Sequence, residues 1–277
     1  METNHGNKLY TFIKYALVIT GAVIVAIPIL YILISGFKTS YEISQPLKFP
    51  ANPNFDNFMK VFNNKTVMFS FINSFIITGV SVLIDVIICS IAGYSIGRSN
   101  KKIFALLYLF FLSAMMIPAV ANLTSIYSII YQLGLKDTRL GLILVEASMQ
   151  IPMGILLFTG FIKTIPKELD EAASLDGCGY FRRFFQIIFP LLKPITFSYA
   201  TIASIQVWND FLMPLLILSD NHKKPITLAI YGFVNEHGAD YGAIYASLII
   251  AMIPPILFFL FSQKYLYSGI TAGSVKG

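Results

Sequence analysis

The sequence predicts an all-α fold, a polytopic membrane bundle of six transmembrane helices. Of its 277 residues, 56% are hydrophobic and only 12% are charged, and the mean hydropathy is +0.71. Soluble domains contain about 25% charged residues, so this composition argues against one. Six stretches are also long and apolar enough for a bilayer core about 30 Å thick, which a helix of about 20 residues crosses. These two observations together indicate a membrane protein.

The six predicted spans follow one another along the chain with polar connections between them. They are residues 15–34, 67–96, 103–131, 140–162, 195–218 and 241–262. The first lacks the small-residue cleavage site of a signal peptide, so we expect a retained anchor. Pro118 lies in the middle of the third span. The predicted organisation is a polar N-terminus at 1–14, a transmembrane domain at 15–262 and a polar tail at 263–277.

The distribution of basic residues predicts the orientation in the membrane. With the N-terminus inside, the 20 Lys and Arg divide into 12 on the inner and 8 on the outer side. An excess of positive charge marks cytoplasmic loops. Both termini and the polar stretch 164–194 are therefore expected in the cytoplasm of a cell-membrane protein. The net charge of +6 lies in these loops rather than along one stripe, so no nucleic-acid partner is expected.

The sequence contains no recognisable catalytic or metal-binding constellation. Its three histidines are far apart, and no phosphate-binding loop occurs. The two cysteines do not indicate a disulfide framework. We therefore expect a chain that is not an enzyme, with no catalytic residue, no metal site and no cofactor of its own.

The polar stretch 164–194 predicts two helices with a break between them. Pro166 suits a first helical turn, and three acidic residues follow where the helix dipole favours negative charge. Gly177 is the residue type that ends helices in a left-handed conformation. From Phe181 a second amphipathic pattern begins, and Pro190 and Pro194 close it.

This stretch resembles the EAA loop of ABC importer permeases. The matching residues are Glu171, Ala172, Ala173, Gly177, Ile187 and Pro190. Phe189 stands where that family usually has leucine, and it keeps a large apolar side chain. Without this resemblance, the stretch would be an ordinary amphipathic loop resting on lipid headgroups.

The wider sequence resembles the maltose-type sugar permeases of binding-protein-dependent importers. The supporting strings are residues 165–169, 208–212 and 265–277. The resemblance implies a heterodimer with a second homologous permease, two ABC ATPase subunits and an extracytoplasmic solute-binding protein. ATP and Mg are then bound by the ATPases and not by this chain. It also implies a carbohydrate as solute, an oligosaccharide or related polyol, without identifying which one.

The resemblance assigns the EAA segment as a cytoplasmic coupling helix. It implies that an ATPase docks on Glu171, Ala172, Ala173, Asp176 and Gly177. ATP-driven docking then switches the bundle between inward-open and outward-open states.

Three acidic residues fall inside the predicted spans, where a charge costs about 2.5 kcal/mol or more. They are Asp85, Glu146 and Asp210, and no Lys or Arg lies within the spans to pair with them. Asp210 follows Trp208 and Asn209, and an aromatic ring, an amide and a carboxylate are the groups that bind a polyol. Trp208, Asn209, Asp210 and Asp85 are therefore candidates for the substrate pathway. Helix–helix hydrogen bonds and an interfacial tryptophan explain them as well.

The alternative function is an ATP-independent secondary carrier that uses Asp85 or Asp210 as its titrating group. The EAA-like loop and the absence of paired repeats favour the importer. Copurification of an ATPase with this chain distinguishes the two functions.

Overall fold

The computed structural model describes residues 3–46, 48–235 and 238–274. The chain forms two compact units. The first consists of Met1–Lys65 and Ile230–Met252, and the second of Thr66–Ala229 and Ile253–Gly277.

The first unit contains one long helix, two short ones, a small hairpin and the start of the last helix. These elements are α1 (Thr3–Ser35), α2 (Ser40–Ile43), α3 (Asp56–Asn63), β1 (Val234–Asn235), β2 (Gly238–Ala239) and the beginning of α14 (Tyr241–Ser274). Asn57 on α3 donates from its side-chain amide to Gly36 O at 3.0 Å and to Lys38 O at 2.9 Å. Lys60 forms an ion pair with Asp240 at 2.9 Å. These bonds hold α3 between the end of α1 and the start of α14.

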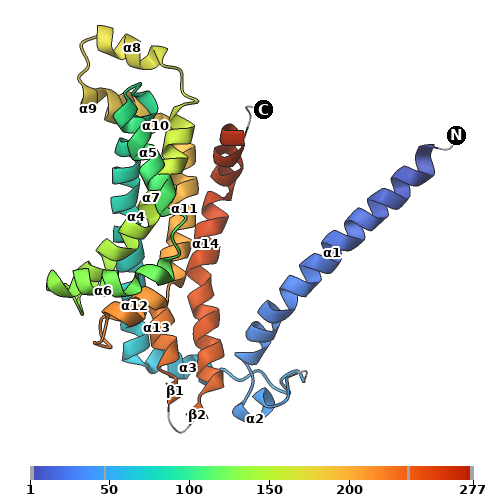
Figure 1. Cartoon of the computed structure of the whole chain (residues 1–277). Coiled ribbons are helices and arrows are strands. Elements are labelled where there is room, and N and C mark those ends of the chain that lie inside the picture. Colours follow the sequence, from blue (N-terminus) through green and yellow to red (C-terminus); the bar gives the residue numbers. More distant parts are fainter. Residues whose placement is uncertain (1–2, 47, 236–237, 275–277) are drawn as a thin grey trace. The chain divides into compact units, whose positions relative to one another are not determined.

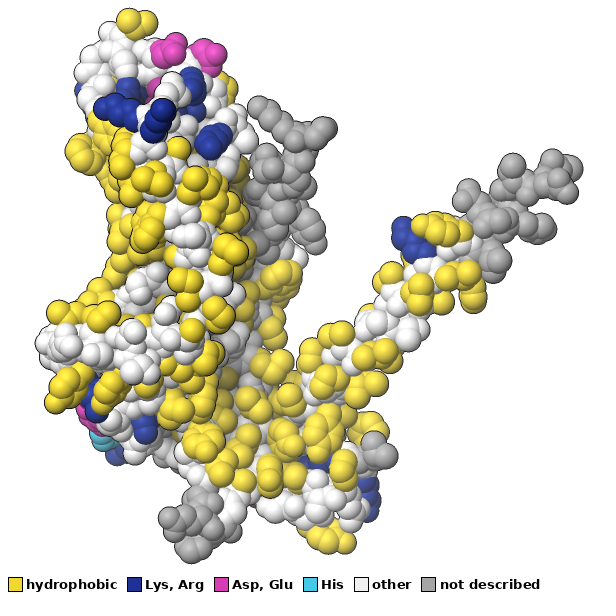
Figure 2. Space-filling model, viewed as in Figure 1, with side chains coloured by type: hydrophobic (Ala, Val, Ile, Leu, Met, Phe, Trp, Pro, Cys, Tyr) yellow, Lys and Arg dark blue, Asp and Glu magenta, His cyan; other side chains and the backbone are white. Residues whose placement is uncertain are grey.

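The second unit is the helical bundle that carries the candidate sites. Its helices are α4 (Lys65–Arg98), α5 (Lys102–Ala114), η1 (Ala119–Asn122), α6 (Leu123–Gln132), α7 (Arg139–Ile162), α8 (Glu168–Leu175), α9 (Tyr180–Arg183), η2 (Phe184–Ile188), α10 (Phe189–Leu191), α11 (Lys193–Asn209), α12 (Leu212–Ile217) and most of α13 (Ile226–Tyr231). Within this unit, α8 and α9 lie at one end, and α6 and α12 lie at the other (Figure 1). Hydrophobic side chains cover the middle of its visible face, and charged ones gather toward the ends (Figure 2). This distribution suits a bundle surrounded by lipid.

Helices α4, α7 and α11 pack closely where their side chains are small. A Cβ atom added to Gly154 on α7 would lie 2.5 Å from Cys89 Sγ of α4 and 2.9 Å from Tyr199 Cζ of α11. The hydroxyl of Ser81 on α4 donates to Ile143 O of α7 at 3.2 Å. Small residues and interhelical hydrogen bonds take the place of the hydrophobic effect inside a membrane. These contacts make the three helices one packed group.

The structure corrects two of the predicted spans. Four helices are long and apolar enough to cross a membrane, or up to six if each of two bent pairs counts as one span. Residues 103–131 are not one continuous helix, because α5 and the segment η1–α6 are bent by 97° at Pro118. Proline lacks an N–H and keeps the residue before it out of the helical region. Residues 195–218 are broken at Asp210, whose backbone is extended between α11 and α12.

The connection between α6 and α7 is tied to the connection after α12. Asp137, with φ of 56°, accepts hydrogen bonds from the backbone amides of Asp220 at 3.0 Å and Ser219 at 2.9 Å. Its other carboxylate oxygen lies 3.0 Å from Lys223 Nζ. The two amides, then the lysine, lower the pKa of Asp137 to about 2. The carboxylate form therefore stabilises this end of the bundle.

Candidate functional site

The predicted helix–glycine–helix in residues 164–194 is present, with its first helix starting slightly later than expected. Pro166 precedes the N-cap residue Lys167 rather than occupying the first turn of α8. Gly177 has φ of 77°, as the sequence predicted. Its N–H donates to Ser174 O at 3.1 Å, and the next N–H, of Cys178, donates to Ala173 O at 2.9 Å. These two bonds form a Schellman motif, which ends α8 sharply and turns the chain back.

The second helix of the loop does not present the single apolar face that we predicted. Phe184 and Ile188 are buried, whereas Phe181 and Phe185 are 68% and 49% exposed. The reason is a π-helical segment, η2, which shifts the positions that share a face. The helix also continues through Pro190 as α10, and a bend of 76° separates the run Tyr180–Leu191 from α11.

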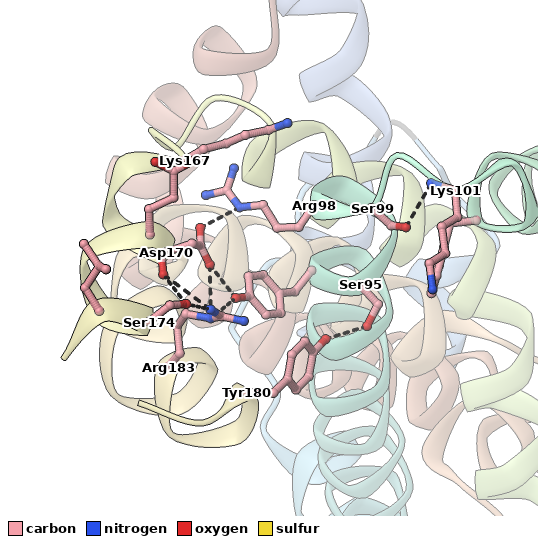
Figure 3. Close-up of a pocket in the computed structure, with 13 residues that line it drawn as sticks. Ser95, Arg98, Ser99, Lys101, Lys167, Asp170, Ser174, Tyr180 and Arg183 are labelled. Atoms are coloured by element: carbon pink, nitrogen blue, oxygen red, sulfur yellow. Dashed lines mark hydrogen bonds and ion pairs between the residues drawn. The ribbon is translucent and has the colours of Figure 1, made fainter. Parts of the chain in front are cut away.

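The carboxylate of Asp170 joins α8 to two other helices, α4 and α9 (Figure 3). One oxygen lies 2.8 Å from Arg98 Nε of α4, and the other lies 3.6 Å from Arg183 Nε of α9. The Tyr94 hydroxyl of α4 donates to Asp170 and accepts from Arg183 Nε at 2.9 Å. Arg183 also donates to Ser174. The side chains of the three charged residues are only 13% to 21% exposed, so these contacts are poorly screened.

Arg98 also ties down the chain that enters α8. Its guanidinium donates to Ile165 O at 2.9 Å and to Pro166 O at 3.4 Å. Ser95 of α4 and Tyr180 of α9 share a hydrogen bond of 2.7 Å. An open cavity of about 940 Å³ lies around this junction. The whole loop is therefore attached to the end of α4.

One face of α8 is left exposed, and two of its residues, Glu171 and Leu175, also line the cavity around these attachments. We call it the docking face; its residues are Glu168, Glu171, Ala172, Leu175 and Asp176. They recur at i, i+3, i+4, i+7 and i+8, which places them on one side of a helix. Leu175 is 89% exposed, whereas Ala173 on the opposite side is 4% exposed. An exposed leucine among acidic residues is a surface suited to a protein partner.

The candidate pathway residues separate into two groups. A cavity of about 460 Å³ is lined by Asn209 and Asp210, together with Glu146, Gln150, Gln206 and several apolar side chains. Trp208 does not line it; this ring is 2% exposed and packs against Phe75, with 5.0 Å between ring centroids. Asp85 is fully buried beside Tyr199 and does not line the cavity either.

Asp210 also closes the break between α11 and α12. Its carboxylate accepts from the backbone N–H groups of Leu212 at 2.9 Å and Met213 at 3.2 Å. These donors have no partner within the helix, because the first turn of a helix leaves its N–H groups free. The backbone carbonyl of Asp210 accepts from the Thr227 hydroxyl at 2.7 Å. Asp210 therefore shapes this end of the cavity as well as lining it.

Several functional residues were not identified from the sequence. Asp170 and Arg98 lie on different helices, α8 and α4, far apart in sequence, and no local spacing links them. Glu146 of α7 and Asp210 at the end of α11 likewise line one cavity although they are far apart in sequence. The available clue was the rarity of charge: an acid inside a span, or an arginine at the end of one, needs a partner.

Comparisons with known proteins identify the family. Residues 89–272 match the family described as binding-protein-dependent transport system inner membrane component. The melibiose/raffinose/stachyose import permease protein MelC of Bacillus subtilis (strain 168) is 36% identical over 256 residues, which cover 91% of each chain.

Solved structures share the fold. A crystal structure of a bacterial ABC transporter involved in the import of the acidic polysaccharide alginate matches with a TM-score of 0.85 at 19% identity, over 96% of this chain and 99% of that chain. The bacterial alginate ABC transporter in complex with an alginate pentasaccharide-bound periplasmic protein matches with a TM-score of 0.69 at 16% identity, over 94% and 96% of the two chains.

These matches favour the importer hypothesis over the ATP-independent carrier. The chain belongs to the family of binding-protein-dependent transport system inner membrane components, and it is a multi-pass permease subunit of an ABC importer.

Proposed function

We propose that this permease imports a carbohydrate, with both chain termini in the cytoplasm. Its partners are a second homologous permease, two ABC ATPase subunits that bind ATP and Mg, and an external solute-binding protein. The family description, which includes a binding protein, and the sugar permease that is 36% identical support this assignment. Oligosaccharides and related polyols are the solute class that we assign.

The observation that carries the proposal is the attachment of α8. This helix is fixed to α4 and α9 through Asp170, and the docking face is exposed. A helix held in this way transmits force, because moving it requires breaking ion pairs that water screens little. We assign the docking face as the surface that an ATPase grips.

The residues of the EAA segment divide between docking and support. Glu171 offers a carboxylate for a basic side chain of the ATPase, Ala172 allows close approach, and Asp176 adds negative charge at the end of the helix. Ala173 is buried in its own chain and supports the docking face from behind. Gly177 fixes the turn into α9.

A movement of α8 reaches the cavity through helices that the contacts connect. The movement passes through Arg98 to α4 and to the segment that follows α7. It passes to α11 through the consecutive segments α9, η2 and α10. Glu146 of α7 and Asn209 of α11 line the cavity near the other ends of these helices. Docking of the ATPases therefore switches access to the cavity from one side of the membrane to the other.

The pathway residues take two different roles in this proposal. Asn209 and Asp210 contact the solute from the cavity wall. Trp208, packed against Phe75, and the buried Asp85 hold the helices that form the wall.

The test is a charge reversal on the docking face. In Glu171→Lys we expect the permease to insert and pair normally, while copurification of the ATPase and ATP-driven uptake both fall about tenfold, a loss of roughly 1.4 kcal/mol of binding. Asp56→Lys, at an exposed acid on α3, is the matched control and keeps both. Full coupling in Glu171→Lys, or an ATPase that never copurifies with the unaltered chain, would contradict the proposal.

A further inference from the structure

The cavity between α7 and α11 has an unusual set of polar groups. Two carboxyl groups and three side-chain amides line it, those of Glu146, Asp210, Gln150, Gln206 and Asn209. Among the described residues no Lys or Arg lines it, and neither carboxyl group is ion-paired with a base. The polar lining therefore consists of carboxyl oxygens and neutral amides.

Glu146 indicates that the cavity is built for a ligand. Its side chain is 3% exposed, and Oε1 has no hydrogen-bond partner among the described residues. A buried polar atom without a partner costs about 1–3 kcal/mol, so such atoms need a reason. The carboxyl group of Asp210 lines the same cavity.

We propose that Glu146 and Asp210, with the amides of Gln150, Gln206 and Asn209, form a solute subsite that accepts neutral hydroxyl-bearing sugars and rejects anionic ones. This inference rests on the proposed carbohydrate importer. The unpartnered Oε1 of Glu146 accepts a sugar hydroxyl, and the amides both donate and accept.

The selectivity follows from charge. The two carboxyl groups make the cavity acidic, and like charges repel strongly in a site of low dielectric. A uronate or a sugar phosphate entering the cavity finds no lysine or arginine to compensate it. A neutral sugar needs no basic residue in the cavity, because its hydroxyls donate hydrogen bonds to carboxylates. This chain therefore differs in specificity from the alginate importer that shares its fold.

Thiol labelling of the assembled importer measures this charge without using transport. Gln206→Cys places an exposed thiol on the cavity wall, and Ser125→Cys on α6 is the matched control outside it. Both are made with Cys178→Ser, because Cys89 is fully buried. The probes are a trimethylammonium-ethyl and a sulfonatoethyl methanethiosulfonate, which differ mainly in charge. Labelling of this chain is followed by mass spectrometry.

We expect the ratio of the labelling rate by the cationic reagent to that by the anionic reagent to be about tenfold higher at Gln206→Cys than at Ser125→Cys. The double change Glu146→Gln and Asp210→Asn removes both carboxyl groups, and it should return the ratio to that of the control. If the double variant does not assemble, the comparison between the two cysteine positions remains decisive. Equal ratios at the two positions would overturn the inference.

Protection by sugars provides the second measurement. Raffinose or maltotriose, two neutral trisaccharides, should slow labelling of Gln206→Cys severalfold, and trimannuronate at the same concentration should not. Protection by trimannuronate, or by none of the three, would overturn the subsite. ATP-driven uptake by the importer with unaltered Gln206 tests the importer itself, so failure of the subsite and failure of the proposed function are distinguishable.

Discussion

Removing the charge of Asp170 should loosen α8 from the bundle. Asp170→Asn keeps the size of the side chain but leaves the guanidinium groups of Arg98 and Arg183 without their common partner. Tyr94 also loses a charged acceptor. The helix itself should still form, because its Schellman motif at Gly177 does not involve Asp170.

The size of the effect follows from the geometry. Removing one partner of a buried charge pair costs about 3–5 kcal/mol, whereas exposed pairs contribute at most about 1 kcal/mol. The side chains here are 13% to 21% exposed and the shorter contact is 2.8 Å, so we expect about 2 kcal/mol. At 1.36 kcal/mol per factor of ten, opening of α8 becomes about 30 times more frequent.

Hydrogen–deuterium exchange of the assembled importer measures this opening. Amides of α8 should lose about 30-fold of their protection in Asp170→Asn, while those of α7 should not change. Asp56→Asn on α3 is the control, because this exposed acid lies outside the docking face and has no ion pair among the residues that the structure describes. Equal protection of α8 in the wild type and Asp170→Asn would refute the assignment of Asp170 as the attachment point.

Three further predictions concern single positions. Gly177→Ala forces a side chain into a backbone with φ of 77°, so we expect a loss of about 1–2 kcal/mol and faster tryptic cleavage after Arg183. Leu175→Asp changes a side chain that is 89% exposed; thermal stability should change by less than about 0.5 kcal/mol, whereas copurification of the ATPase should fall about tenfold. Asp137 has a pKa lowered from 3.8 to about 2, so its tether stabilises the fold above pH 3.8 and is lost as the pH falls toward 2. Asp137→Asn tolerates the same φ, and its melting temperature should fall less than that of the wild type over this pH range; equal falls would exclude the tether.

Local patterns predicted the parts of the structure that depend on neighbours in sequence. The acidic first turn, the glycine turn and the apolar spans are of this kind, and Gly177 has the left-handed backbone that its residue type suggested. The broken third span was predictable in place but not in angle. Pro118 marks the break, whereas the bend of 97° depends on packing.

Contacts between distant parts of the chain could not be predicted in this way. Nothing near Asp170 in the sequence points to Arg98, and nothing near Glu146 points to Asp210. The burial of Ala173 could not be predicted for a related reason. The sequence does not show which of the neighbouring residues Ala172 and Ala173 packs against the rest of the chain. The π-helical segment η2 also has no single-sequence signature, and it changed which phenylalanines are exposed.

The close packing at Gly154 gives α7 a pivot. Along a helix that rises 1.5 Å per residue, Glu146 and Ile162 each lie about 12 Å from this glycine, in opposite directions. A tilt of α7 about that point therefore displaces the cavity wall and the end of α7 that leads to α8 by similar distances in opposite directions. Glu146 and Ile162 therefore move by similar amounts. A bulkier residue at position 154 would clash with Cys89 and Tyr199 and block this tilt.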